Sequence, residues 1–186
     1  MPIEQALGDT EHNQPVTSNS SHRSASPSGG QGCLIIVCGL PGSGKTTEAK
    51  RLSLQRPGVR FAPDEWMNAL GVNLWDSAMR QRIESLQWVM AKELLRLGTT
   101  VIVEWGTWGR DERDSLRTQA RELGASVELH HLDVPLDELW RRIQARNAET
   151  PPVERSDVED WAHTFQAPDE AELRQYDRNL HQSMER

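Results

Sequence analysis

The stretch Gly39-Leu40-Pro41-Gly42-Ser43-Gly44-Lys45-Thr46 decides the fold of this chain. It has the pattern of a complete phosphate-binding loop, and the apolar run Cys33–Cys38 comes directly before it. A helix-compatible run from Thr46 to Leu54 comes directly after it. A strand, a glycine-rich turn and a helix N-terminus in this order predict a cradle of backbone N–H groups that binds an anion.

The residue types in the loop fit a nucleoside triphosphate together with Mg²⁺. Lys45 can reach the β- and γ-phosphates, and the Thr46 hydroxyl can ligate the metal ion. We therefore expect ATP and Mg²⁺ as cofactors. The residues expected to bind the nucleotide are Gly39, Pro41, Gly42, Ser43, Gly44, Lys45, Thr46 and Thr47.

Length and charge limit the classes of function. A chain of 186 residues suggests one domain with a substantial core. The formal net charge of −7 argues against a protein that holds nucleic acid on a broad basic surface. We therefore expect a small molecule as the partner and not a nucleic acid.

Cysteine use and hydropathy indicate a reducing, aqueous compartment. Cys33 and Cys38 lie on one predicted strand and should point to opposite faces, which favours core residues over a disulfide. No apolar stretch approaches the roughly 20 residues that span a membrane. The N-terminus also lacks the basic start and apolar block of a signal peptide. We expect a cytoplasmic monomer or weak dimer without membrane contact.

The chain divides into a tail and a folded domain. Residues 1–31 are rich in Ser, Gly, Pro, Asn and Gln, which predicts a disordered tail, and residues 32–186 form the predicted domain. Strand and helix patterns alternate, which predicts an α/β fold, a three-layer αβα sandwich with a parallel sheet and ligands beyond the carboxyl ends of its strands. The expected strands are 33–38, 59–62, 99–104 and 126–132, and the expected helices are 45–54, 77–97, 111–123, 135–146, 156–165 and 169–183.

Asp64 is the candidate catalytic carboxylate. It follows the short predicted strand 59–62 and begins a helical turn. In that place it would face the γ-phosphate and could take the proton of a substrate hydroxyl as the oxygen attacks phosphorus. The alternative is a helix N-cap, since Asp after Pro is a favoured helix start, and the two roles are compatible.

Two further acidic residues follow strands. Glu104 ends an apolar strand and could hold a water ligand of Mg²⁺ or bind substrate, or it could simply face solvent. Asp133 could be taken for the acidic metal residue of such folds, but its Asp-Val-Pro-Leu-Asp context favours a cap on the next helix. His130 and His131 are adjacent on a strand and so should face opposite ways.

Arg142 and Arg146 are the candidate cationic catalytic residues. They are four residues apart, so they share one face of the helix that starts at Pro135. Arginines at the end of such a helix can neutralise charge on a transferred phosphoryl group. The alternative is an exposed basic face that pairs with Asp137 or Glu138.

The sequence leaves the roles of the other arginines and of the tryptophans open. The chain has 18 Arg and 3 Lys, which we attribute mostly to background composition. Exposure at a helix start is the simpler account of Arg110 and Arg113, although both could contact an anionic substrate. Four of the seven tryptophans lie in loops near strand ends, where stacking on a ring-bearing substrate and simple packing are equally good interpretations. These four are Trp66, Trp75, Trp105 and Trp108.

Together these motifs resemble those of small bacterial P-loop kinases, the ATP-binding group known broadly as AAA-family ATPases. Similar proteins are zeta toxins, chloramphenicol phosphotransferase and the kinase domain of polynucleotide kinases. The resemblance covers residues 33–178 and is carried by the segments 39–46, 61–66, 104–106 and 132–135 with Arg142 and Arg146.

The resemblance implies a P-loop NTPase fold of the nucleoside-kinase type and roles for particular residues. Lys45 and Thr46 would bind ATP and Mg²⁺, and Asp64 would activate a hydroxyl. Arg142 and Arg146 would lie in or beside a mobile lid. Residues 65–68 depart from polynucleotide kinases because they include no arginine for a substrate phosphate, which argues against a nucleic-acid 5′-hydroxyl.

The leading hypothesis is a kinase that transfers the γ-phosphoryl group of ATP to a hydroxyl of a small molecule. One alternative is a nucleic-acid end kinase or a toxin-type nucleotide-sugar kinase. Another is an ATPase switch that acts on a protein partner. The chain lacks the Asn-Lys-x-Asp motif of guanine specificity, which lowers the case for a GTPase.

Overall fold

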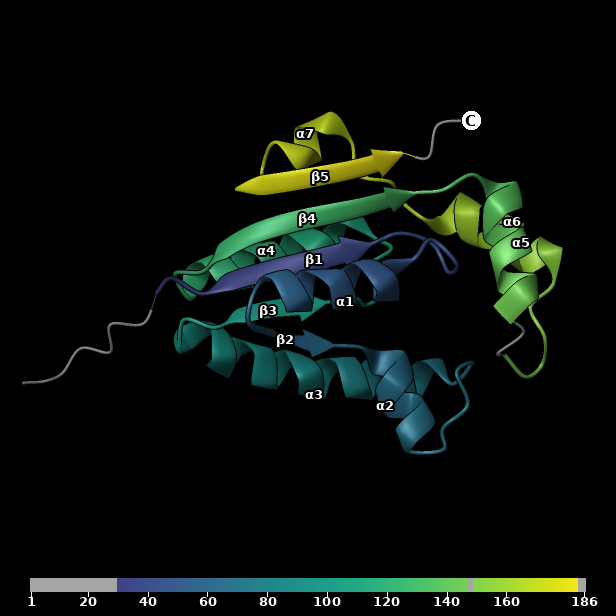
Figure 1. Ribbon diagram of the computed structural model, residues 1–186, viewed down its shortest axis with the longest axis horizontal. Helices are drawn as coiled ribbons and strands as arrows, with labels where there is room; N and C mark the ends of the chain where they lie inside the picture. Colours follow the sequence, from purple (N-terminus) through teal and green to yellow (C-terminus); the bar gives the residue numbers. More distant parts are fainter. Residues whose placement is uncertain (1–29, 147–148, 184–186) are drawn as a thin grey trace, which may run out of the picture.

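A five-stranded parallel sheet forms the centre of the structure, with strand order β2-β3-β1-β4-β5 and helices on both faces (Figure 1). The computed structural model describes residues 30–146 and 149–183. The predicted disorder of residues 1–31 therefore concerns a segment that lies, except for its last two residues, outside the described residues. Within the described ranges, no helix has the length and apolar character needed to cross a membrane.

The elements follow the predicted alternation closely, so the predicted fold class is confirmed. The strands are β1 (Cys33–Cys38), β2 (Gly58–Phe61), β3 (Thr100–Val103), β4 (Ser126–Asp133) and β5 (Arg178–Ser183). The helices are α1 (Lys45–Gln55), α2 (Pro63–Ala69), α3 (Ser77–Arg96), α4 (Arg110–Glu122), α5 (Leu136–Arg146), α6 (Arg155–Thr164) and α7 (Glu170–Leu173).

β1 is the central strand of the sheet and is buried on both faces. Leu34, Ile36 and Cys38 pack with apolar residues of α3 and α4, whereas Ile35 and Val37 pack with α1 on the other face. A strand covered on both sides needs a continuous apolar run, which is the pattern that its sequence shows. Cys33 and Cys38 are free thiols on opposite faces, as predicted.

The predicted helix over 169–183 is wrong. Asp169 caps the single turn α7 by accepting a hydrogen bond from the Glu172 N–H at 2.6 Å, and the chain then becomes β5, which pairs with β4 in parallel. Asp177 starts this pairing, because its carboxylate accepts from the Val127 N–H at 2.7 Å and its own N–H donates to the Val127 carbonyl at 2.9 Å. β5 is an edge strand with a polar sequence, so no apolar run marks it.

The helices α5 and α6 lie beyond the carboxyl ends of the strands, where Figure 1 shows them to the right of the arrowheads. Leu139 and Ile143 of α5 pack with Val158 of α6 in a small core of their own. This pair of helices therefore stands next to the loop that follows β1, at the edge where ligands of parallel α/β folds bind.

Arg113 is completely buried and clamps the C-terminal segment to the loop after β3. Its guanidinium donates to both carboxylate oxygens of Glu172, at 2.6 and 2.9 Å, and to the carbonyls of Thr107 and Gln166 at 3.0 and 2.8 Å. The expected exposure of Arg113 at a helix start is therefore wrong. Arg110 lies nearer the surface and pairs with Asp169.

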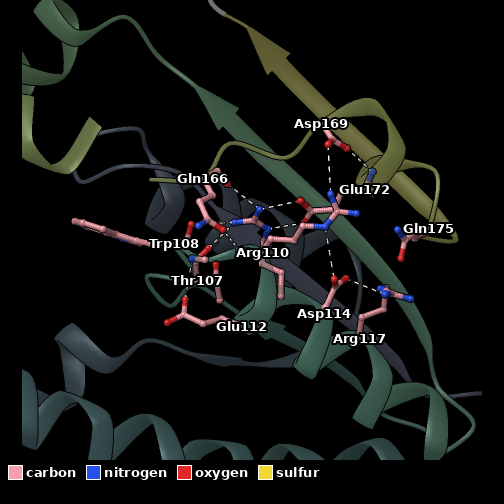
Figure 2. Close-up of polar contacts among 12 residues, drawn as sticks. Thr107, Trp108, Arg110, Glu112, Asp114, Arg117, Gln166, Asp169, Glu172 and Gln175 are labelled. Carbon is pink, nitrogen blue, oxygen red and sulfur yellow. Dashed lines mark hydrogen bonds and ion pairs between the residues drawn. The ribbon is translucent and has the colours of Figure 1, made fainter. Parts of the chain in front are cut away.

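The clamp fixes the position of Trp108. The Gln166 N–H donates to the Trp108 carbonyl at 3.0 Å, and the Gln166 side chain accepts from the Arg110 N–H at 2.9 Å. Figure 2 shows Gln166 next to Thr107 and Trp108, with the Trp108 indole extending away from the cluster. The backbone of the loop is thus held while its aromatic ring stays outside the clamp.

We predict that Arg113→Met destabilises the fold by about 3 kcal/mol, because it leaves the Glu172 carboxylate buried without its counter-charge. The matched change Arg110→Met removes an exposed ion pair and should cost about 0.5 kcal/mol or less. Urea denaturation of both variants measures the difference. Equal destabilisation by the two changes would contradict the role of the clamp.

Candidate functional site

A cavity of about 810 Å³ opens at the carboxyl edge of the sheet. The loop after β1, the starts of α2 and α3, the segment after β3, and α5 and α6 all contribute to its lining. Of the residues predicted as site residues, Gly39 and Ser43 are in the loop but do not line the cavity. The predicted residues that line it are Pro41, Gly42, Gly44, Lys45, Thr46, Thr47, Asp64, Glu104, Arg142 and Arg146.

The loop turns into α1 through a left-handed residue. Gly44 is the N-cap of α1 with φ 101°, a conformation that favours glycine, and no atom lies within 4 Å of where its Cβ would be. Gly44 and the first residues of α1, Lys45, Thr46 and Thr47, line the cavity, so the N-terminus of α1 lies at its wall. Backbone N–H groups and the helix dipole at such an end attract phosphate oxygens.

Gly42 brings the loop against α5. A Cβ at Gly42 would lie 3.1 Å from the Ile143 side chain and 3.2 Å from the Leu139 carbonyl, so a side chain has little room there. The Arg142 guanidinium donates to the carbonyls of Gly42 and Ser43, at 3.3 and 3.4 Å. The loop and the helix that carries the predicted arginines are thus in direct contact.

Lys45 folds back across the loop. Its ammonium donates to the carbonyls of Gly39 and Leu40, at 2.9 and 3.1 Å. Burial lowers the pKa of Lys45 to about 8, although the nearby Asp64 and Glu104 carboxylates favour the charged form. A bound phosphate would supply a counter-charge for this ammonium, which the neutral loop carbonyls do not provide.

Asp64 lies in the first turn of α2, exposed to the cavity, and its nearest partner is an arginine that the sequence analysis missed. Arg80 of α3 donates to the Asp64 carboxylate at 2.5 Å and to the Leu74 carbonyl at 3.2 Å. Residues 65–68 supply no arginine to the cavity, and Arg80 reaches it from further along the chain. The signal in the sequence was the Asp76 N-cap, which starts α3 near the same edge.

Glu104 lies just after β3, almost completely buried, and one of its oxygens contacts Arg60. Burial raises the pKa of Glu104, while the nearby Thr46 hydroxyl and the Arg60 guanidinium act in the opposite direction. Its other oxygen, Oε2, has no hydrogen-bond partner among the described residues. A buried carboxylate oxygen beside a threonine hydroxyl is the hard oxygen donor set that suits Mg²⁺.

Arg142 and Arg146 both line the cavity from α5, and each has a carboxylate partner. Arg142 donates to Glu138 at 2.7 Å, and Arg146 donates to Glu149. The two interpretations made from the sequence, pairing with Glu138 and placement over the phosphates, are thus compatible for Arg142.

The four tryptophans divide into two groups. Trp66 packs against Phe61, and Trp105 is buried and donates to the Gln87 side chain at 2.8 Å, so these two serve packing. Trp75 and Trp108 line the cavity, together with Trp161 of α6, which the sequence analysis did not single out.

The remaining polar candidates lie elsewhere. Asp133 is exposed at the end of β4 and outside the cavity lining. His130 contacts Glu48 at 3.1 Å, and His131 stacks on Phe165, so the two histidines face opposite ways as predicted. In the part of the chain that the structure describes, no cluster of three or more His, Cys, Asp or Glu side chains could hold a metal ion.

Comparisons with known proteins agree with this fold. Residues 34–168 match a family model described as an AAA domain (AAA_33). A candidate kinase of Chloroflexus aurantiacus is 22% identical over 81% of this chain and 87% of that chain, with a TM-score of 0.63. A sugar kinase of Janibacter sp. HTCC2649 is 21% identical over 80% and 83%, with a TM-score of 0.58.

Chaetomium thermophilum Kti12, solved in complex with ADP-AlF3, is 18% identical over 81% of this chain and 88% of that chain, with a TM-score of 0.62. No curated protein matches the sequence. At these identities, the likeness to solved structures shows a shared P-loop kinase-like fold and leaves the substrate open.

The lowered pKa of Lys45 predicts that nucleotide binding depends on pH. Below about pH 8 the lysine is an ammonium that attracts phosphate, and above this value the free protein loses that charge. The affinity for ATP should therefore be constant up to about pH 8 and then fall by up to about tenfold per pH unit. Calorimetric titrations with ATP, from mildly to strongly alkaline pH, measure this affinity.

The matched control is Lys50→Met, which removes an exposed lysine of the same helix and should leave the break in the pH profile in place. A wild-type affinity that stays constant across pH 8 and well above it would contradict the assignment of Lys45 as the phosphate-binding cation.

Proposed function

We propose that this chain, which belongs to the AAA domain family, is an ATP-dependent kinase that transfers the γ-phosphoryl group to a hydroxyl group of a small molecule. The observation that carries the proposal is that the Asp64 carboxylate and the phosphate-binding loop line one cavity. A carboxylate beside the phosphate-binding loop can accept the proton of an acceptor hydroxyl.

Asp64 is well placed for general base catalysis. It lies close enough to Lys45 to favour the charged form of that lysine, so it is near the place where the terminal phosphate would bind. Asp64 would accept the proton of the acceptor hydroxyl as its oxygen bonds to the γ-phosphorus and the bond to ADP breaks. Arg80, which donates to Asp64 at 2.5 Å, would orient the carboxylate.

The phosphate end of the cavity gathers positive charge. Lys45 crosses the loop, and Arg142 reaches the loop carbonyls from α5. Arg146 lines the same cavity from the end of that helix. In phosphoryl transfer these groups would neutralise the charge that spreads over the transferred oxygens, since catalysis depends mainly on positioning and electrostatics.

Thr46 and Glu104 would hold Mg²⁺, as the donor set at the loop indicates. Bound there with ATP, the ion would supply charge neutralisation at the phosphate oxygens. Thr46 would contribute its hydroxyl as a ligand, and Glu104 its buried Oε2 through a water molecule or directly. Arg60 contacts the other carboxylate oxygen, Oε1, of Glu104 and so fixes the orientation of the carboxylate.

The Asp64→Asn variant tests the proposed function. It should lower the transfer rate by about two to four orders of magnitude, because the amide cannot accept the proton, while ATP affinity changes little. Lys45→Ala should weaken ATP binding itself. The assay incubates the protein with γ-labelled ATP and a library of small alcohols, and it follows labelled products separately from free phosphate.

Asp133→Asn is the matched control, since Asp133 lies outside the cavity, and it should change neither binding nor transfer. An Asp64→Asn variant that transfers at the wild-type rate would refute the general base. Release of free phosphate that a protein partner stimulates, without any phosphorylated alcohol, would point instead to an ATPase switch.

The role of Glu104 at the metal ion can be tested by substitution. Glu104→Gln should raise the Mg²⁺ concentration needed for tight ATP binding by about tenfold or more, because the amide is a weaker partner for the hydrated ion. Calorimetry of ATP binding at graded Mg²⁺ concentrations measures this effect. If Asp133→Asn shifts the Mg²⁺ dependence and Glu104→Gln does not, the metal assignment is wrong.

A further inference from the structure

We propose that the acceptor is an uncharged alcohol carried on an aromatic ring system, and that Trp75, Trp108 and Trp161 form the wall on which this ring lies. The inference rests on the proposed function and names the substrate class of the same cavity. It is carried by the geometry of the three indoles, by the pairing of the charges around them and by the scarcity of neutral hydrogen-bonding groups in the lining.

The three indoles, here called the tryptophan wall, come from three separate segments of the chain, and Trp161 contacts both of the others. Trp161 of α6 lies 6.2 Å from Trp75 and 6.3 Å from Trp108, measured between ring centroids, at interplanar angles of 41° and 67°. Rings at such distances form a continuous aromatic surface. All three line the cavity, so this surface faces the space where a ligand would bind.

The Trp75 ring and the Trp108 backbone are held by contacts outside the cavity. The indole N–H of Trp75 donates to the Pro151 carbonyl at 3.1 Å, and the Trp108 backbone is fixed by Arg113 and Gln166. The polar atom of Trp75 is therefore used, which leaves ring faces for the ligand. Aromatic rings that are fixed in advance lose little conformational freedom when they bind a flat ligand.

The wall lies on the acceptor side of the phosphate-binding loop. Trp75 directly precedes α3, whose first turns carry Arg80, the partner of Asp64. Trp108 lies in the segment that follows Glu104. A ring on the wall would thus hold its side-chain hydroxyl toward Asp64, the group proposed to take the proton.

The charges in the lining balance, which argues for an uncharged acceptor. Among the described residues, four cationic side chains and four carboxylates line the cavity. The cations must also serve the phosphates of ATP, so no surplus positive charge remains for an anionic acceptor. The arginines of the lining are paired as Arg80–Asp64, Arg142–Glu138 and Arg146–Glu149.

The uncharged side chains of the cavity lining argue against a polyol as the acceptor. Hydroxyl-rich ligands need many side-chain partners, and the described lining includes no Asn, Gln or His. Its neutral hydroxyl groups are Thr46 and Thr47, which belong to the phosphate-binding loop, and Ser77. The lining also includes the apolar side chains of Leu74 and Val153. Apolar and aromatic surface of this kind favours a flat, largely apolar ring.

The test compares three alcohols on the full chain: naphthylethanol, its ring-carboxylate derivative and sorbitol. Ligand-observed proton NMR measures binding of each alcohol without turnover, and phosphorus NMR with ATP and Mg²⁺ measures transfer. We expect naphthylethanol to bind and to be phosphorylated in preference to the other two. Trp161→Leu should weaken its binding about tenfold, while ATP affinity stays within about twofold.

Three further variants sharpen the result. Trp161→Phe keeps an aromatic face and should restore most of the binding. Trp75→Leu changes a ring that is 41% exposed, so it should weaken binding without disturbing the core. Trp140→Leu is the matched control, because Trp140 packs beside Leu139 and Val158 outside the cavity, and it should leave naphthylethanol binding unchanged.

Preferred phosphorylation of sorbitol or of the carboxylate derivative would overturn the acceptor class and leave the kinase proposal standing. Weaker ATP binding in Trp161→Leu, with naphthylethanol binding unchanged, would overturn the wall as an acceptor site and assign it to the adenine ring. If naphthylethanol binds in a Trp161-dependent way but no alcohol is phosphorylated, the wall is supported and the kinase reaction is refuted.

Discussion

The turn from β1 into α1 is the constraint on which the rest of the structure depends. β1 is buried on both faces and lies between β3 and β4, so its carboxyl end has a fixed position. Gly44, in the left-handed region, then turns the chain into α1, whose first residues line the cavity. Because α5 packs on Gly42 without room for a side chain, the loop also fixes where Arg142 lies.

Charge pairing explains how so many ionic groups share this small region. Arg60 holds Glu104, Arg80 holds Asp64 and Glu138 holds Arg142, so each charged side chain has a fixed partner before any ligand arrives. Preorganised charges cost little further reorganisation during a reaction, which is the condition for electrostatic catalysis. Lys45 is the exception, since its hydrogen-bond partners are loop carbonyls, and burial lowers its pKa.

The sequence was a good guide where local rules decide the structure. Continuous burial of β1 demands a continuous apolar run, and the turn demands glycine, so both are visible in the residues themselves. It was a poor guide where tertiary contacts decide. Arg80 reaches Asp64 only through the path of α2 and α3, and β5 is held by backbone pairing that a polar edge strand does not reveal. Arg113 was detectable, because the helical period places it on the same face as Leu116 and Ala120.

The amides at the start of α1 are proposed to bind the phosphates of ATP. The most direct test is amide-resolved NMR of the full chain during titration with Mg²⁺ and a non-hydrolysable ATP analogue. We expect the largest shifts at residues 42–47, with smaller shifts at Asp64 and in α5. Saturable shifts confined to other parts of the sheet edge, or no shifts at 42–47 when the analogue is in excess, would contradict it.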